Sequence, residues 1–450
     1  MKKLVLILFA AALIICLVAC DSASNQPEET RDFEYALNED GVSYSVIGMG
    51  DYDNDEEITI PNEYNGLPVT KIGKKAIRGN AVSVILPESL EIIDERAFYG
   101  SYVEGIKIPD SCRIIGKEAF MKCYSLKTVD LGNGLTTIED SAFASCEELT
   151  TIDIPNSVNL IGIKAFFGCS KLSNVSIPDD ATVGNYAFSG TAINSVNIMK
   201  NTTYGVGVFS NCDQLTNVSI EEGVDKISDR IFEMCDAIDN IVVPDGVTHV
   251  GEYAFKDSGL RSVIIPNSIT YIGQGAFTCL HLNYNKDQDG NRYLGNSENP
   301  YFLFMMPRSF DVESVTIGGS CKYIYPEACG YWYLNQEVTY FTKLTSVSIL
   351  NDVTYIGEGA FSGCENLKNV TISDSVTNIE NRAFENCSIL QSIEIPQSVS
   401  IISGSAFRGC NWLTIYCESD TQPSGWDLDW NKLEWGGDSC VPVVWGYTAE

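Results

Sequence analysis

The hydrophobic positions of this chain recur in one short pattern, which residues 149–169 show most completely. Ile152 and Ile154 lie two residues apart, so both side chains fall on the same face of a β-strand. Pro155 follows directly and has no N–H to donate, so we expect the strand to end there. The second inward-facing pair is Val158 and Ile161. The pattern therefore predicts a coil with two short extended segments.

An Ala-Phe dipeptide near the end of the unit allows the copies to be counted. There are fourteen units, and eleven of their thirteen spacings are 21 to 23 residues. The two longer spacings, 52 and 32 residues, surround one disturbed region between residues 277 and 361. The second position of the dipeptide falls at Ile77, Phe98, Phe120, Phe143, Phe166, Phe188, Phe209, Phe232, Phe255, Phe277, Cys329, Phe361, Phe384 and Phe407. A fixed period in this range is typical of a leucine-rich-repeat solenoid.

A single unit of this kind cannot fold alone. Burial of roughly six large apolar side chains contributes about 9–18 kcal/mol at best. Fixing the backbone costs about 1–2 kcal/mol for each of some twenty residues, which is more than burial supplies. We therefore expect the units to stack. Ala165, Phe166 and Cys169 would fill the far wall of their coil, as a short extended piece or a single helical turn.

The unit L-x-x-I-x-I-P-x-S-V-x-x-I-G-x-x-A-F-x-x-C resembles the BspA-like leucine-rich-repeat family of bacterial surface proteins. The resemblance covers nearly the whole mature chain. It implies a mainly β solenoid of short parallel strands stacked coil on coil, with short turns or single helical turns on the convex side. The closest copies are residues 149–169, 260–277, 344–364, 367–387 and 390–410.

The glycine that stands three residues before Ala-Phe is not invariant. Gly116 and Gly162 occupy this position in two units, whereas Glu139 and Glu380 occupy it in two others. Because a glutamate resists positive φ, we expect that this position does not require the left-handed conformation.

Residues 1–19 have the features of an export signal. A charged start, Lys2 and Lys3, precedes a short apolar run that ends at Ala19. The sequence Leu-Val-Ala-Cys at this point resembles the bacterial lipobox, which implies that Cys20 becomes the lipidated first residue of the mature protein. The alternatives are a plain cleaved signal peptide and an uncleaved anchor. Residues 20–32 would then be a lipidated polar tether.

The repeat is expected to be closed at both ends, because an open solenoid exposes its core. Residues 33–71 are interpreted as an N-terminal cap that begins with a β-hairpin around Asp40-Gly41. Asp51, Asp53 and Asp55 lie in this cap without the glycine and glutamate of a calcium loop, so a solvated turn is favoured and no metal is predicted. Residues 411–450 hold five of the six tryptophans and are interpreted as a C-terminal cap; the alternative is a sugar-stacking module.

The composition favours one elongated, non-enzymatic domain spanning residues 72–410. A solenoid grows without the size limit of a globular core, so 450 residues do not require several domains. The 60 acidic against 29 basic residues, a net charge of −31, argue against nucleic acid as a partner. His249 and His281 stand in unrelated contexts, and no catalytic motif is present. We therefore predict no enzyme activity and no cofactor.

The sixteen cysteines do not form a disulfide pattern. Eight occupy the same repeat position, three residues after the Phe: Cys123, Cys146, Cys169, Cys212, Cys235, Cys364, Cys387 and Cys410. Stacked coils lie about 4.8 Å apart, whereas a disulfide requires Cβ atoms about 3.8 Å apart, so reduced core thiols are expected. Cys417 and Cys440, outside the repeat, are the pair for which a disulfide is considered.

Two surfaces are candidates for binding. The outward residues of the strands are mostly small and uncharged, such as Thr151, Asn174 and Ser176, and form either a polar groove for a protein or glycan or a ladder that satisfies itself. Insertions near residues 280–311 and 330–343 carry the aromatic residues. The candidate contact residues are Tyr293, Tyr301, Tyr331, Trp332 and Tyr333. The alternative for the first insertion is a structural flap that folds back on the solenoid.

The family resemblance implies a lipid-anchored protein on the outer face of the bacterial cell membrane that binds macromolecules through an extended repeat surface, as in adhesion. The alternative is a glycan-binding or structural envelope scaffold protein. The expected partners are proteins or glycans at the cell surface, with the membrane contacted through Cys20. The chain is expected to be a monomer.

Overall fold

The computed structural model describes residues 32–50, 57–78, 81–307, 309–330, 341, 343–434 and 437–448, and the backbone alone of 332–334 and 337–339. All regular elements within these ranges are β-strands, joined by turns. Since the described residues contain no helix, none of them forms an apolar helix of membrane-spanning length. The turns on the side opposite the longer strands are likewise not helical.

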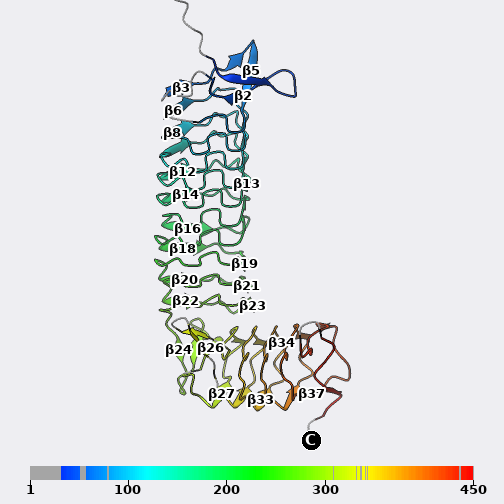
Figure 1. Cartoon of the computed structure of the whole chain (residues 1–450). Helices are drawn as coiled ribbons and strands as arrows, with labels where there is room; N and C mark the ends of the chain where they lie inside the picture. The colour runs from blue at the N-terminus through cyan, green and yellow to red at the C-terminus, as the bar shows by residue number, and fades with distance from the viewer. Residues whose placement is uncertain are drawn as a thin grey trace, which may run out of the picture.

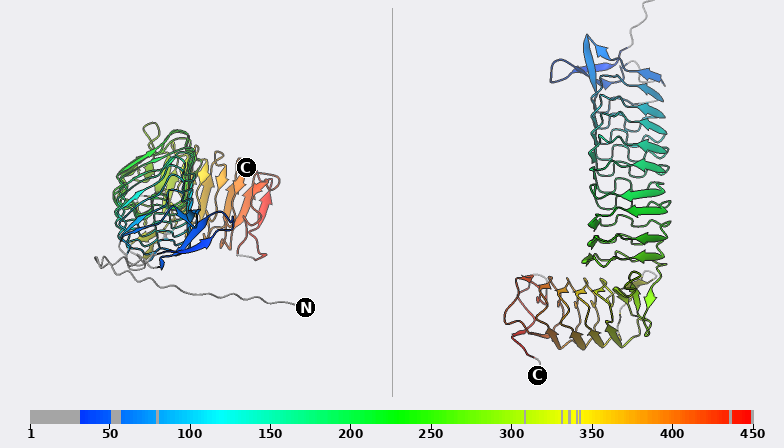
Figure 2. Two further views of the ribbon diagram at one scale, coloured as in Figure 1. Left: turned by 90° about the horizontal axis from the view of Figure 1, so that it is seen from above. Right: turned by 180° about the vertical axis from the view of Figure 1, so that it is seen from behind.

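The chain winds into two straight columns that meet at a corner, and each column has two walls of parallel strands (Figures 1 and 2). We call the column of residues 32–278 the first arm and that of residues 279–448 the second arm. The wall with mostly three- and four-residue strands is called the long-strand wall, and the opposite wall, with mostly two-residue strands, is called the short-strand wall.

The long-strand wall of the first arm is composed of β3 (Glu57–Thr59), β6 (Ser83–Ile85), β8 (Gly105–Lys107), β10 (Thr128–Asp130), β12 (Thr151–Asp153), β14 (Asn174–Ser176), β16 (Ser195–Ile198), β18 (Asn217–Ile220), β20 (Asn240–Val242) and β22 (Ser262–Ile264). The short-strand wall of this arm is composed of β1 (Glu34–Leu37), β2 (Tyr44–Gly48), β4 (Glu63–Tyr64), β5 (Leu67–Ile72), β7 (Ile92–Ile93), β9 (Ile114–Ile115), β11 (Thr137–Ile138), β13 (Leu160–Ile161), β15 (Thr182–Val183), β17 (Thr203–Tyr204), β19 (Lys226–Ile227), β21 (His249–Val250) and β23 (Tyr271–Ile272).

The long-strand wall of the second arm is composed of β27 (Ser314–Ile317), β31 (Ser346–Ile349), β33 (Asn369–Ile372), β35 (Ser392–Ile395), β37 (Thr414–Cys417) and β39 (Val443–Trp445). Its short-strand wall is composed of β24 (Asn285–Lys286), β25 (Arg292–Leu294), β26 (Leu303–Met306), β28 (Tyr323–Ile324), β32 (Tyr355–Ile356), β34 (Asn378–Ile379), β36 (Ile401–Ile402) and β38 (Gly425–Trp426). The remaining two strands, β29 (Trp332–Leu334) and β30 (Glu337–Thr339), pair as an antiparallel hairpin.

The core of the first arm is a continuous stack of the repeat phenylalanines. From Phe98 to Phe277 each ring lies nearly parallel to the next, with centroids 4.7–6.1 Å apart. The backbone supports the stack, because the N–H of Phe143 donates to the carbonyl of Ala165 in the next coil at 2.8 Å. Each coil thus supplies both the apolar surface and the hydrogen-bond acceptors that its neighbour requires.

The repeat cysteines form the predicted ladder of reduced thiols. All of them are buried and free of disulfides. Each thiol donates a hydrogen bond to a backbone carbonyl of the preceding coil; Cys146, for example, lies 3.1 Å from the carbonyl of Phe120. The prediction of reduced core thiols is confirmed, and the ladder has a further role in satisfying buried carbonyl groups.

The repeat glycine is not in the left-handed conformation, as its replacement by glutamate indicated. It permits a close approach instead, since a Cβ on Gly162 would lie 2.5 Å from the backbone nitrogen of Asp140 in the preceding coil. The left-handed residue is the one immediately before Ala-Phe, with φ of 56° at Glu118 and 57° at Lys164. The sequence analysis missed this position because it is mostly not glycine.

The long-strand wall is flat, which corrects the expectation of a concave face. Both arms run straight in Figures 1 and 2. A curved solenoid needs one wall that is thicker than the other. Here both walls consist of strands with the same spacing of about 4.8 Å, so successive coils stack without a wedge.

The first insertion builds the corner between the arms. Strands β24, β25 and β26 form an antiparallel sheet, and β26 then pairs in parallel with β28 to begin the second arm. Two buried tyrosines join the arms: the hydroxyl of Tyr323 accepts from the N–H of Ile272 at 2.8 Å, and that of Tyr325 accepts from Phe277 at 2.8 Å. These hydroxyls replace the backbone acceptors that a regular next coil would provide.

Both ends of the core are covered. At the N-terminal end, Tyr35 stacks on Tyr64 with ring centroids 3.9 Å apart. At the C-terminal end, Trp430 is buried against Phe407, and the indole N–H of Trp426 donates to the carbonyl of Val399 at 3.1 Å. The tryptophans of this segment therefore extend the phenylalanine stack and close it, although Trp412 is exposed and Trp435 lies outside the described residues.

Adjacent phenylalanines allow a direct test of the stack. Phe166 has no exposed surface, whereas the next residue, Phe167, is 39% exposed. We expect Phe166→Ala to lower the free energy of unfolding by about 3–5 kcal/mol, because it opens a cavity in the stack. Phe167→Ala should cost less than about 1 kcal/mol. Urea denaturation followed by circular dichroism measures both; equal losses would contradict the assignment of the core.

The corner tyrosine predicts a second stability effect. Tyr323→Phe removes the hydroxyl that accepts from the N–H of Ile272 and should cost about 1–3 kcal/mol. The amide of Ile272 should also exchange with solvent faster. The control is Tyr271→Phe, which removes a neighbouring hydroxyl that forms no hydrogen bond within the described part of the chain. Unchanged amide exchange in Tyr323→Phe would rule out this role in joining the arms.

Candidate binding surface

The outward side chains of the long-strand wall form rows that follow the axis of the first arm. In β10, β12 and β14 the central residue of each strand faces the core, while the residues on either side are exposed. The strand register places Thr128 beside Thr151 and Thr151 beside Asn174. The same arrangement continues in β16 and β18, where Ser195 lies beside Asn217. The predicted rows of exposed polar residues are therefore present, on a flat face.

This wall is interrupted between β14 and β16, and again between β18 and β20. The six-stranded sheet ends at β14, and β16 pairs only with β18, so no ladder joins the two sheets among the described residues. The coil that contains the first break is also irregular in sequence. The spacing from the repeat Phe to the inward residue of the next strand is eight positions here, from Phe188 to Val196, and nine in the coils before and after. Thr191 stands at the position that a cysteine occupies in most other coils.

A hollow of about 320 Å³ lies at the first interruption. Its lining combines uncharged polar side chains with an apolar floor: Asn174, Val175, Ser176, Ile177, Ser195, Val196, Asn197, Met199 and Ser219. The hydroxyl of Ser219 donates to the side-chain oxygen of Asn197 at 2.8 Å. Convergent hydrogen-bonding groups over an apolar floor are typical of a binding site. The lining contains no charged side chain, although the chain carries a net charge of −31.

The structure places two of the five predicted aromatic contact residues in or against the core. Tyr293 is only 2% exposed; its ring packs edge-to-face on Tyr301 and Phe304. Its hydroxyl donates to Asp287 at 3.1 Å, and burial raises the pKa of this phenol. Tyr301 is half-buried and donates to the carbonyl of Lys286 at 3.3 Å. The prediction that Tyr293 contacts a partner is wrong, because almost none of its side chain is exposed to solvent.

The remaining three aromatic residues lie in the second insertion, and their contact with a partner stays a prediction. Tyr331 lies outside the described residues. Trp332 and Tyr333 belong to β29, for which the structure describes only the backbone and its pairing with β30. The first insertion does not project from the solenoid, since its strands are built into the corner.

The cysteines outside the repeat do not form a disulfide. Cys417 is buried in β37, whereas Cys440 is exposed in the C-terminal segment, and both are free thiols. The structure therefore corrects the prediction that considered a disulfide between them. Burial raises the pKa of both Cys364 and Cys417 to about 12, which keeps these thiols protonated at neutral pH and unreactive as nucleophiles.

The described residues also lack the side-chain groupings that catalysis or metal binding would require. His249 contacts the hydroxyl of Thr248 at 2.7 Å and is not within a carboxylate or nucleophile network. No group of three or more His, Cys, Asp or Glu side chains in the described part of the chain is arranged to hold a metal ion. Cys20 and the acidic run of residues 51–56 lie outside the described residues.

The stacked strands, the inward ladder of apolar residues and the two flat walls define a leucine-rich-repeat solenoid, a class whose extended surfaces bind other molecules. Residues 51–111, 91–205, 202–329 and 333–421 match the BspA type Leucine rich repeat region in six copies. The chain therefore belongs to the BspA-type leucine-rich-repeat family.

Solved structures of bacterial leucine-rich-repeat proteins are similar to this chain. A protein from Bacteroides ovatus shares 26% identity over 88% of each chain, with a TM-score of 0.48. A leucine-rich cell surface protein from Faecalibacterium prausnitzii shares 24% identity over 85% of this chain and 86% of its own, with a TM-score of 0.29. A comparison with curated protein sequences found no match.

Proposed function

We propose that this chain is a lipid-anchored protein of the bacterial cell surface that binds a macromolecular partner, as in adhesion, through the long-strand wall of its first arm. The observation that carries the proposal is the hollow between β14 and β16, where hydrogen-bonding side chains converge over an apolar floor. The rows above and below it extend this surface over many coils, as an elongated partner requires.

The composition of the face favours a partner recognised by hydrogen bonds rather than by charge. Its Ser, Thr and Asn side chains are short, so they lose little conformational freedom when a partner binds. The exposed apolar residues Val242 and Ile264 lie side by side at the corner end of the same wall and add a hydrophobic contact. A protein chain offers both kinds of group.

The alternative function is that of a glycan-binding or structural envelope scaffold protein. An exposed cluster of tryptophans at the C-terminal end would support sugar stacking. Trp426 and Trp430 are instead buried at 4% and 1% exposure, which favours the adhesion proposal. The covered ends also support a monomer, since the described residues leave no open core for a second copy.

The surface assignment predicts which substitutions abolish binding. Ser176→Arg with Asn197→Arg introduces bulk and charge into the hollow and should weaken binding roughly tenfold or more. The probes are immobilised fibronectin, laminin and collagen together with a glycan array. The matched control is Thr316→Arg with Thr371→Arg, exposed at equivalent strand positions in the second arm. Equal loss in both double variants would contradict the first-arm site.

Binding by the second insertion, near residues 330–343, is tested with the same probes. Tyr331→Ala with Trp332→Ala should leave the affinity unchanged if the hollow is the binding site. A loss confined to this double variant would instead assign binding to the second insertion. Binding to neutral glycans of the array alone would favour the alternative function, and binding to neither set would reject the adhesion proposal.

Anchoring is tested independently at Cys20. Cys20→Ala removes the acylated side chain, and the polar residues 21–32 supply no membrane affinity, so the protein should move from the membrane fraction to the medium. Fractionation with an immunoblot measures this. The size of the product in the membrane fraction and in the medium separates an uncleaved anchor from a cleaved signal. Retention of a cleaved Cys20→Ala product at the wild-type level would exclude the lipid anchor.

A further inference from the structure

A basic hollow lies on the turn edge of the first coils of this acidic protein. It has a volume of about 390 Å³ and is lined by Lys75, Ile77, Arg78, Arg96 and Tyr99. Residues 74–78 contain three basic and no acidic side chains. The sequence analysis did not single out this hollow, because its lining residues come from two successive coils.

Only part of this positive charge is neutralised within the protein. Arg96 pairs with Glu118 at 2.6 Å, and Lys74 pairs with Glu95 at 2.6 Å. Three further cations have no ion-pair partner among the described residues: Lys75, Arg78 and Lys122. Arg78 donates from Nε to the carbonyl of Lys75 at 2.9 Å, which leaves the terminal nitrogens of its guanidinium available.

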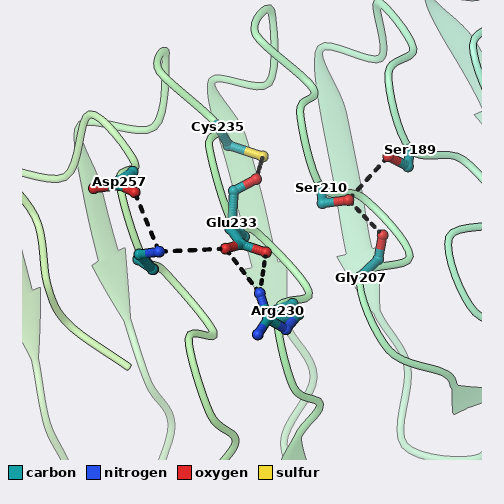
Figure 3. A network of polar contacts seen from close by, with 8 residues as sticks. Ser189, Gly207, Ser210, Arg230, Glu233, Cys235 and Asp257 are labelled. Carbon is teal, nitrogen blue, oxygen red and sulfur yellow. Dashed lines mark hydrogen bonds and ion pairs between the residues drawn. The ribbon is translucent and has the colours of Figure 1, made fainter. Parts of the chain in front are cut away.

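A second cluster in the same arm shows the neutralised form of this arrangement. Arg230 and Lys256 lie 4.4 and 5.3 Å from the ring centroid of Tyr253. Both cations are within ion-pair distance of Glu233, and Lys256 also contacts Asp257 (Figure 3). Both cations of that cluster therefore have carboxylate partners within the protein. The basic hollow and its rim have the same cation and tyrosine groups, but their two ion-paired carboxylates, Glu95 and Glu118, face five cations: Lys74, Lys75, Arg78, Arg96 and Lys122.

The walls of the hollow combine charge with apolar surface. The Tyr99 ring is 38% exposed and lies 5.7 Å from the Arg96 guanidinium and 5.9 Å from the Lys122 ammonium. Ile77 supplies an aliphatic floor. A ligand that fits must carry an anionic group for the cations and an apolar face for the ring and the floor. Sugar acids have both, since their C–H faces pack on aromatic rings.

We infer that this hollow is a second binding site, separate from the long-strand wall, which takes the acidic sugar units of a polysaccharide. The cations at Arg78, Arg96 and Lys122 come from successive coils, so a linear polymer with recurring acid groups contacts one cation on each coil. Acidic residues elsewhere on the protein weaken the binding of an acidic polymer little, because charges are screened beyond about 10 Å at 0.1 M salt.

The test measures binding of the chain from residue 21 onward to four polymers of matched length. These are heparin for sulfate, polygalacturonate for carboxylate, dextran for a neutral sugar and polyglutamate for an acidic peptide. We expect binding of heparin, polygalacturonate or both, and none of dextran. The affinity should fall as salt rises. Because the protein has a net charge of −31, binding of any polyanion requires a local basic site.

The variants assign the binding to residues. Lys75→Ala with Arg78→Ala should weaken binding of the acidic polysaccharide roughly tenfold, through loss of two charge-assisted contacts. Tyr99→Ala should weaken it as well if the ring packs on the sugar. The control is Lys226→Ala with Lys368→Ala, which removes the same charge at exposed positions away from the hollow. Thermal melting verifies that each variant is folded.

Each remaining outcome contradicts the inference. Equal binding of polyglutamate and polysaccharide, unaffected by Tyr99→Ala, would indicate a site for acidic proteins. Equal losses in the control pair would indicate a diffuse charge effect. Absence of binding to both acidic polysaccharides would exclude the site. None of these outcomes depends on the hollow between β14 and β16, because Ser176→Arg with Asn197→Arg should not alter polysaccharide binding.

Discussion

The hydrogen bonding between successive coils is the interaction on which the rest of this structure depends. Outside the hairpins at the N-terminal end and at the corner, the strands of both walls pair only with strands of neighbouring coils. The repeat residues support this pairing at each level. Phe143 donates its N–H to Ala165 of the next coil, and the thiol of Cys146 donates to the carbonyl of Phe120 in the preceding one. A shortened coil does not by itself break the ladder, because β6 and β8 pair across the equally shortened unit of Phe98.

Two departures from the repeat coincide with a change in the surface. The coil of Phe188 is shortened and lacks the ladder cysteine, and the long-strand wall opens there into a hollow. The insertion after Phe277 replaces a regular coil, and the arms meet at that point through the hydroxyls of Tyr323 and Tyr325. In a regular solenoid the binding surface is uniform along its length. Irregular coils give it particular sites.

The two proposed sites differ in the chemistry they offer. The hollow on the long-strand wall is lined by uncharged side chains such as Asn174 and Ser195, whereas the hollow at Arg78 and Tyr99 is cationic. An acidic molecule repels polyanions except where its basic side chains gather. The net charge of −31 would therefore contribute to specificity as well as to solubility.

Repetition made much of this protein readable from its sequence. The period of 21 to 23 residues, the inward residues of each strand and the ladder of reduced cysteines all follow from local patterns that stacking repeats many times. The exposed polar rows were predictable for the same reason, since alternation along a strand fixes which side chains face the solvent.

Features that depend on contacts between distant segments required the tertiary structure. Tyr293 resembles an exposed loop residue in sequence, but β26 carries its hairpin into the short-strand wall and buries the ring. The flatness of the strand face follows from the equal spacing of two walls, which no single repeat reveals. The basic hollow arises because stacking brings Arg78, Arg96 and Lys122 of separate coils to one edge. Local order was thus specified by sequence, and only the packing of coil on coil decided where the sites lie.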